Sequence, residues 1–190
     1  MRWQELGAFA GVVYRSHEGI HRSANTQPWS TDATLDHFAR FARVFRAFRP
    51  YRRQLMAEAS ERGWPVVRHP VLHYPDDPVL LADRDVDLPL FGSAAAHAAA
   101  LRDTHVREFM LGADWLVAPV LAPGVATVRV YFPRGVWASL WDETGDVVDA
   151  REGGVWREVA APIGRPAVFS RAGAGSANGV RGALREAGLL

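Results

Sequence analysis

Neither cysteine nor lysine occurs in this chain. None of its 190 residues is Cys, and all 22 basic residues are Arg. Without cysteine the fold has no disulfide and no thiolate metal site, and we expect a cytoplasmic protein. We interpret the lack of lysine as coding bias, because no function requires a planar, bidentate cation at every one of these positions.

The chain also lacks a charge excess and long apolar runs. Its net charge is +1, and the arginines alternate with acidic residues instead of forming a block. This pattern predicts no nucleic-acid partner. No stretch approaches the roughly 20 apolar residues that span a bilayer, and Glu5 interrupts the basic start that a signal peptide would need. We therefore expect no membrane partner.

What remains is typical of an ordinary globular protein, at 48% hydrophobic and 23% charged residues. In the first half, apolar residues every three or four positions predict a helix that Ser30 or Thr31 caps. Pro50 should interrupt this helix, and a second one over 51–62 should end at Gly63. The segment 66–73 is short, rich in valine and bounded by prolines, so we predict a buried strand there.

The second half follows a period of two. Strands are predicted, between Pro-Gly, Thr-Gly and Gly-Gly turns, over 115–121, 127–132, 136–141, 155–159 and 167–171. Their spacing is that of a small antiparallel sandwich. An Ala-rich stretch precedes them, and the Gly/Ser-rich residues 173–190 are expected to form a flexible tail. The fold class is thus α/β plus all-β, dividing near residue 107.

His17-Glu18-Gly19-Ile20-His21 matches H-E-x-x-H, in which two histidines one helical turn apart bind zinc and the glutamate activates water. The pattern requires a helix. Gly19 lies at its centre, and a loop of Ser, Asn and Pro follows it. We therefore favour a loop whose histidine has another use, and keep the zinc peptidase as an alternative.

Other acidic motifs are interpreted as structural. Asp83, Asp85 and Asp87 imitate the start of a calcium loop, but Leu88 and Ala94 stand where glycine and a bidentate glutamate are needed. Asp76 and Asp77 are adjacent between prolines, which suits a tight turn. The carboxylates of a glycosidase instead face each other across a sugar, about 5 to 9 Å apart.

Seven tryptophans are many for this length, and aromatic faces stack on sugar rings. Trp137 and Trp141 follow the strand pattern, so we expect them in the sandwich core. Trp29 lies in a loop and is the better candidate for a ring that faces sugar. A non-catalytic carbohydrate-binding or interaction module is therefore a further alternative.

Taken in order, several segments make the chain similar to glycoside hydrolase family 31, which includes α-glucosidases, α-xylosidases and sulfoquinovosidases. The matching segments are Arg2-Trp3-x-Glu5-Leu6-x-Ala8-Phe9, Arg15-Ser16-His17-Glu18-Gly19, Leu35-x-x-Phe38-Ala39-Arg40, Pro50-Tyr51-Arg52, Pro65-Val66-Val67-Arg68, His73-Tyr74-Pro75-Asp76-Asp77-Pro78, Phe109-Met110-Leu111-Gly112 and Leu116-Val117-Ala118-Pro119-Val120. Each is weak alone, but their order and spacing make the set specific over nearly the whole chain.

The resemblance implies a fold in four parts. Residues 1–82 would be the end of a catalytic (β/α)8 barrel, with 66–73 as its eighth strand. Residues 83–107 would be an Ala-rich connection, 108–172 a β-sandwich domain and 173–190 the flexible tail. Active sites of such barrels lie at the C-terminal ends of the strands, where the loop from Arg15 to Pro28 would be found.

The same resemblance implies roles for two residues. His17 matches the family histidine that hydrogen-bonds sugar hydroxyls, and Arg15 matches the arginine that orders the acidic residues around it. The family's two catalytic aspartates match nothing in this chain, so no catalytic residue, metal ligand or cofactor is assigned here. The implied substrate is an α-glycoside, and the implied partner is an N-terminal barrel polypeptide. We expect the chain alone to be inactive.

Overall fold

The computed structural model describes residues 1–11, 25–82, 106–142 and 147–190. The helices are α1 (Arg2–Ala8), α2 (Asp32–Ala47), α3 (Arg49–Arg62), the 3-10 helix η2 (Pro70–Leu72), α4 (Pro78–Ala82) and α6 (Gly175–Glu186). The strands are β1 (Val67–Arg68), β2 (Phe109–Leu111), β3 (Trp115–Ala118), β4 (Thr127–Phe132), β5 (Val136–Ser139), β6 (Val148–Asp149), β7 (Val155–Ala160) and β8 (Ala167–Arg171).

The start of α2 and the end of α3 are those predicted from the sequence, but α3 begins at Arg49 and not at 51, so Pro50 does not mark the break. The Thr31 side chain accepts a hydrogen bond from the backbone nitrogen of Thr34 at 3.2 Å, which caps α2. Phe48 separates the two helices, and Pro50 lies in the first turn of α3, where its missing N–H costs no hydrogen bond. Gly63 ends α3 at φ 74°, a left-handed conformation that glycine adopts without a Cβ clash.

The strands form two sheets. One has six strands in the order β1-β2-β3-β8-β5-β6, and the other is the two-stranded ribbon β4-β7. Every pairing is antiparallel among the residues that the structure describes. Five of the strands begin where the period of two predicted them, so the antiparallel half of the fold class is confirmed.

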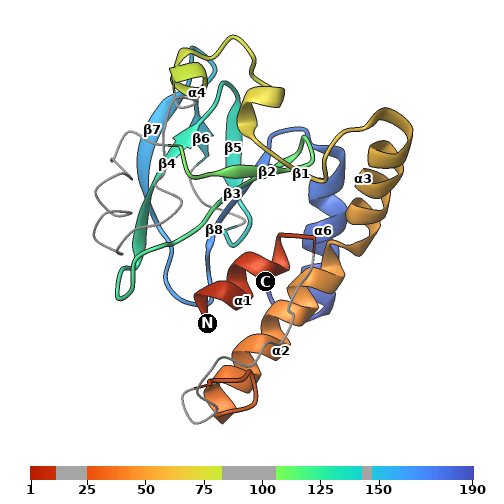
Figure 1. Cartoon of the computed structure of the whole chain (residues 1–190), viewed down its shortest axis with the longest axis vertical. Helices are drawn as coiled ribbons and strands as arrows, with labels where there is room; N and C mark the ends of the chain where they lie inside the picture. The colour runs from red at the N-terminus through yellow and green to blue at the C-terminus, as the bar shows by residue number, and fades with distance from the viewer. Residues whose placement is uncertain (12–24, 83–105, 143–146) are drawn as a thin grey trace.

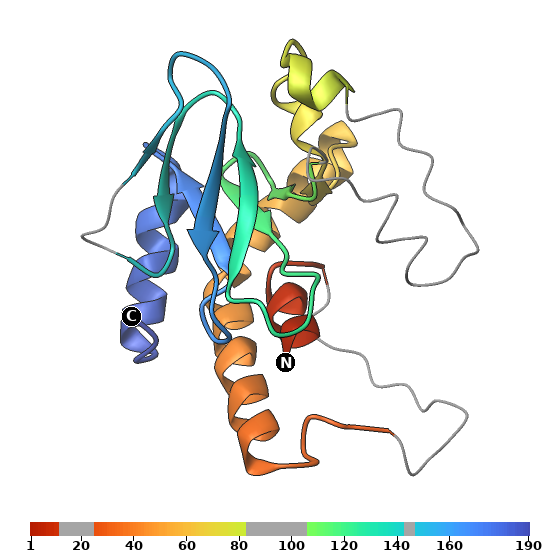
Figure 2. The ribbon, with the colours of Figure 1, turned by 90° about the vertical axis from the view of Figure 1, so that its left-hand side faces the viewer.

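Side chains of the larger sheet alternate between two hydrophobic clusters. In β3, Trp115 and Val117 pack toward the helices, whereas Leu116 and Ala118 pack toward the ribbon with Phe132 of β4. The result is three layers. Helices α2, α3 and α6 cover one face of the sheet and the ribbon covers the other (Figure 1), and Figure 2 views the molecule from the ribbon side.

The two tryptophans expected in the sandwich core have different places. Trp137 is fully buried between the sheets and donates to the carbonyl of Pro133 at 2.8 Å. Trp141 is partly buried on the helix side, where its ring centre lies 6.4 Å from that of Phe41. The core prediction is confirmed for Trp137, while Trp141 joins the other cluster.

The predicted eighth barrel strand over 66–73 is wrong. Only Val67 and Arg68 are extended, they pair with β2, and η2 follows at once. Pro65 and Pro70 bound this piece, and a proline cannot donate to a strand ladder. Val67 is 39% exposed, so the piece is not a buried central strand. The described part of the chain therefore holds no parallel barrel strand.

The flexible tail predicted over 173–190 is also wrong, because α6 occupies most of it. Ala177, Val180 and Leu184 lie on one face of this helix, and all three are buried against the core. The Ser176 hydroxyl donates to the Asp114 carboxylate at 2.6 Å and accepts from the Trp115 indole at 2.9 Å. Burial of this stripe outweighs the low helix propensity of the glycines.

The division predicted near residue 107 does not divide the core. Phe9 and Phe48 from the first half pack in the same cluster as Trp115, Leu140 and Leu184 from the second. The ring centres of Phe48 and Trp115 lie 4.9 Å apart in an edge-on arrangement. The helical and β segments of the described chain therefore share one core. Most of the predicted connection 83–107 lies outside the described residues.

Candidate functional site

The residues with implied sugar-binding roles, Arg15 and His17, lie outside the described residues, as does the whole H-E-x-x-H motif. The same holds for the Asp83 to Ala94 motif. Within the ranges that the structure describes, no group of three or more His, Asp or Glu side chains is placed to hold a metal. What can be described is the frame on both sides of the segment 12–24.

On the N-terminal side of that segment, Arg52 binds the end of α1. Its guanidinium donates to the carbonyls of Ala8 and Ala10, the latter at 3.2 Å, and to that of Phe45 at 2.6 Å. It also lies 3.8 Å from the centre of the Phe45 ring. Burial lowers the pKa of Arg52 to about 10, so it remains a cation at neutral pH. Arg52 thereby holds the end of α1 and the residues up to Ala10 against α3.

On the other side, Trp29 lies in the turn before α2. Its side chain is 65% exposed, and the turn is closed by a hydrogen bond from the Ser30 amide to the Gln27 carbonyl at 3.0 Å. The exposure matches the expectation of a surface ring.

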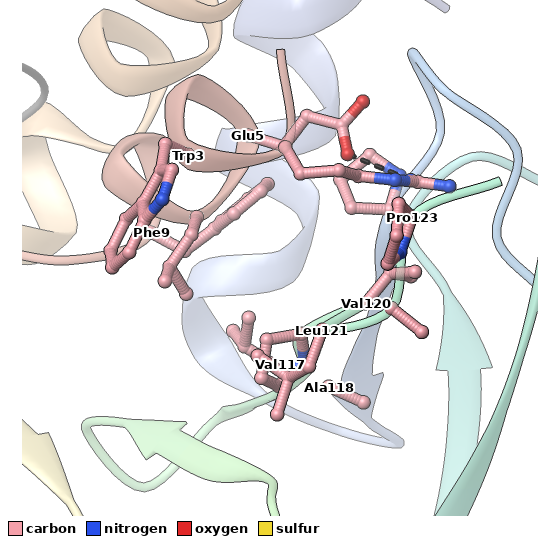
Figure 3. Close-up of a pocket in the computed structure, with 13 residues that line it drawn as sticks. Trp3, Glu5, Phe9, Val117, Ala118, Val120, Leu121 and Pro123 are labelled. Carbon is pink, nitrogen blue, oxygen red and sulfur yellow. Dashed lines mark hydrogen bonds and ion pairs between the residues drawn. The ribbon is translucent and has the colours of Figure 1, made fainter. Parts of the chain in front are cut away.

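An apolar depression lies between α1 and the loop that follows β3. Its volume is about 290 Å³, and Figure 3 shows Trp3 of α1 and Phe9, which follows this helix, on one side and Val117, Val120 and Leu121 on the other. Trp3 is 84% exposed and Leu121 56% exposed, whereas Phe9 is fully buried beneath them. The wall of this pocket is therefore an open apolar surface over a closed core.

Glu5 lines this pocket, but its carboxylate is bound to other groups of the protein. Its carboxylate accepts from the Arg2 guanidinium at 2.9 Å and from the Gly164 amide at 2.7 Å. Arg2 also donates to the carbonyls of Val125 and Ala161, at 2.9 and 2.8 Å. The pair therefore ties α1 to two loops of the β half.

The imidazole of His37, in α2, lies close to the Glu5 carboxylate. Its Nε2 is 3.6 Å from Oε1 of Glu5, and the side chain is buried. Burial lowers the pKa of His37, and the negative charge of Glu5 opposes this shift only in part. His37 is therefore neutral at pH 7.

The acidic turn before α4 is structural, as predicted. Asp77 accepts from the amides of Val79 and Leu80 at 3.0 and 3.2 Å, which caps α4. It also accepts from the Tyr131 hydroxyl at 2.8 and 2.7 Å. Burial, and then this hydrogen bond, raise the pKa of Tyr131. Because Asp77 is occupied in this way and Asp76 is exposed, the two do not face each other across a cleft.

Two segments that carry the family resemblance, 65–68 and 73–78, meet at Arg68 and His73. The Arg68 guanidinium, almost fully buried, pairs with Glu58 of α3 and lies 3.3 Å from Nε2 of His73. The ring of Trp64 stacks on His73 with centres 5.5 Å apart, and Arg68 lies 5.0 Å from its centre. Burial, followed by the charge of Arg68, lowers the pKa of His73. The Arg68–Glu58 pair holds α3 to β1, the first strand of the sheet.

Glu5 and Arg52 belong to segments that carry the resemblance, but the sequence predicted no role for either residue and did not predict the pocket. Arg52 stands close to two other arginines, Arg49 and Arg53, and Glu5 is noted in the sequence only as the residue that interrupts the basic start. The available signal was the helical spacing of Leu55 and Arg52 from Phe48, which places Arg52 beside the apolar stripe.

The fold and its frame define an antiparallel two-sheet domain with helices packed on its larger sheet. The model of the glycosyl hydrolase family 31 C-terminal domain matches residues 63–174. The chain belongs to glycosyl hydrolase family 31. The resemblance noted in the sequence is thus confirmed.

Among relatives, the sulfoquinovosidase of Agrobacterium fabrum is 35% identical over 90% of this chain and 22% of its own length. The sulfoquinovosidase of Escherichia coli is 35% identical over 90% of this chain and 21% of its own length. Alpha-glucosidase 2 of Bacillus thermoamyloliquefaciens is 29% identical over 94% of this chain and 19% of its length. The chain spans about a fifth of the length of these relatives.

A solved structure has the same fold. A family 31 sulfoquinovosidase from E. rectale, in complex with an aza-sugar inhibitor, superimposes with a TM-score of 0.74 at 26% identity. The superposition covers 97% of this chain and 23% of that one. Nearly all of the chain thus corresponds to a minor part of a larger enzyme.

Proposed function

We propose that this chain forms the C-terminal part of a retaining α-glycosidase, whose two catalytic carboxylates lie on polypeptide that this chain does not contain. One observation carries the proposal: similarity to sulfoquinovosidases extends over 90% of this chain but over only 22% and 21% of the enzymes. A part so small holds the end of such an enzyme and not its whole active site.

Retaining hydrolysis needs one carboxylate as nucleophile and a second as acid and base, about 5 Å apart across the sugar. Two partly or fully buried carboxylates of the described chain make structural contacts instead. Asp77 caps α4 and binds Tyr131, and Glu5 binds Arg2 and the Gly164 amide. The proposed contribution of the chain is instead to position the glycoside, with His17 binding sugar hydroxyls and Arg15 ordering the acids around it.

The proposed substrate is an α-glycoside. Among α-glycosides we favour a sulfoquinovoside, because two relatives at 35% identity are sulfoquinovosidases. A chromogenic panel of α-glucoside, α-xyloside and α-sulfoquinovoside tests this. It is applied to the purified chain, to the polypeptide encoded immediately upstream, and to their mixture. We expect hydrolysis in the mixture alone, and His17→Ala in the mixture should abolish most of it.

Sugar release by the isolated chain would contradict the division of the site. No hydrolysis in any of the three samples would contradict the proposal of a split enzyme. Arg53→Ala is the control variant, because Arg53 is exposed on α3 and outside the frame around residues 12–24.

A second candidate is a non-catalytic carbohydrate-binding module, which the 65% exposure of Trp29 favours. Calorimetric titration with maltooligosaccharides distinguishes it. Binding by the chain alone, lost in Trp29→Ala and kept in Trp156→Ala, would support this candidate. Trp156 is a suitable control because its ring packs on Tyr131 and Arg129 in the ribbon.

A further inference from the structure

The pocket between α1 and the β3–β4 loop is bordered by apolar residues that together form what we call the α1 face: Trp3, Leu6, Leu121, Ala122 and Pro123. Trp3 is 84% exposed and Leu121 56% exposed, and all five line the pocket of about 290 Å³. Large apolar side chains exposed side by side, in contrast to single ones scattered over a surface, mark an interaction site.

The α1 face is poorly suited to a small polar ligand. Sites for small molecules combine apolar walls with a few polar groups that point inward. Among the described residues that line this pocket, Arg2 and Glu5 are the charged ones, and both are engaged in contacts within the protein. Arg2 is held by Glu5 and two carbonyls, and Glu5 by Arg2 and the Gly164 amide. What the face offers outward is apolar contact.

The face is also rigidly held, which suits docking without rearrangement. Phe9 fills the space beneath it and packs edge-on against Phe48, with ring centres 5.4 Å apart. Arg52 binds the carbonyl end of α1, and the Arg2–Glu5 pair binds its first turn to loops at 125 and 161–164. Both ends of α1 are therefore fixed, and its exposed side keeps one orientation.

The share of the fold present in this chain indicates what covers the face. The E. rectale enzyme contains this fold as 23% of its chain, and the family model describes residues 63–174 as a C-terminal domain. In such an enzyme the remaining polypeptide is mostly N-terminal to this part. Helix α1 is the first helix of this chain, so in such an enzyme the polypeptide that precedes it continues from beside this face (Figure 1).

We infer that the α1 face is the surface on which the N-terminal catalytic part of a family 31 glycosidase docks, with Trp3 and Leu121 as its anchors. The inference rests on the proposed function for the identity of the occupant. The contact is apolar, so association should persist at high salt, where contacts between exposed charges are screened.

The test measures binding between this chain and the upstream polypeptide by sedimentation, separately from hydrolysis. Trp3→Ser with Leu121→Ser removes both anchors, and their exposure means that the core is left intact. The matched control is Met56→Ser with Leu72→Ser, two exposed apolar side chains outside the face, at 64% and 44% exposure. Circular dichroism checks that all variants fold.

We expect the anchor variant to bind about 30-fold more weakly or worse, and the control to bind as the unmodified chain does. Equal binding by both variants, or no binding by the unmodified chain, would overturn the inference. If the unmodified chain instead forms a dimer that the anchor variant abolishes, the occupant is a second copy and the inference is wrong. Binding without hydrolysis would contradict the proposed function while leaving the docking face in place.

Discussion

Glu5 accepts a hydrogen bond from the amide of Gly164, 2.7 Å away, although 159 positions separate the two residues. The contact joins the first helix of the chain to a turn before its last strand. Together with the Arg2–Glu5 pair it places α1 against the β half. The α1 face therefore depends on a buried carboxylate that the family resemblance includes but does not explain.

Replacing Glu5 should loosen this junction. In Glu5→Gln the Arg2 guanidinium loses its ion pair, and we expect unfolding free energy to fall by about 1 to 3 kcal/mol, since a buried polar group loses its partner. Urea denaturation at low protein concentration measures it. Glu152→Gln is the control because Glu152 is exposed, and it should stay within about 0.5 kcal/mol. Equal stability of the two variants would show that the Glu5 contacts contribute nothing.

Arg52 offers a sharper comparison because an exposed arginine follows it directly. Arg52→Met leaves the carbonyls of Ala8, Ala10 and Phe45 without this donor, and the expected loss is about 3 kcal/mol. Arg53→Met should change stability by less than about 0.5 kcal/mol. Thermal or urea unfolding of both variants checks the difference. A similar loss in both would mean that general helix effects, and not the buried guanidinium, determine the result.

The helices show how far local sequence signals extend. Thr31 and Gly63 act within one turn of their own position, so the start of α2 and the end of α3 followed from capping alone, whereas α3 begins at Arg49, ahead of Pro50. The strands of the β half were equally legible, because a period of two reports which side chains meet the core. Both kinds of signal are local.

The errors occurred where distant contacts decide the structure. Ala177, Val180 and Leu184 form a weak stripe among glycines, and only the core that they cover makes α6 stable. The segment 66–73 has the composition of a buried strand, but its pairing with β2 is antiparallel and lasts two residues. The roles of Glu5 and Arg52 were likewise hidden, since their partners are 159 and 44 positions away.

Acid should destabilise the fold through His37. Burial lowers the pKa of His37 in the folded state below the value of 6.5 that it has in the unfolded state. At a pH between these two pKa values, the unfolded state binds a proton and the folded state does not. The contribution of neutral His37 to the free energy of unfolding is therefore fully present above about pH 6.5, and it decreases as the pH falls below that value. We expect His37→Gln to lose less stability than the unmodified chain between pH 7 and pH 5, as measured by urea denaturation.

The control for His37 is Phe41→Leu. The two rings are in contact, with centres 4.8 Å apart, so this change disturbs the same packing without removing a titratable group. Phe41→Leu should lower stability by the same amount at both pH values. If His37→Gln retains the full acid sensitivity, another group is responsible for it.

Two glycines with the same backbone conformation separate steric clash from backbone strain. Gly112, in the turn between β2 and β3, has φ 59°, and a Cβ there would lie 2.2 Å from the Tyr51 hydroxyl and 2.5 Å from a methyl of Leu55. Gly124 has φ 76°, and a Cβ there meets nothing within 4 Å.

Gly124→Ala should cost only the strain of a left-handed residue, about 1 kcal/mol. Gly112→Ala should cost about 3 kcal/mol, because overpacking of the core adds to the strain. Tyr51 is hydrogen-bonded to Leu111 and Asp114, at 3.2 Å each, and cannot move aside without breaking both contacts. Urea unfolding of the two variants measures the difference, and equal losses would mean that α3 shifts freely away from the turn.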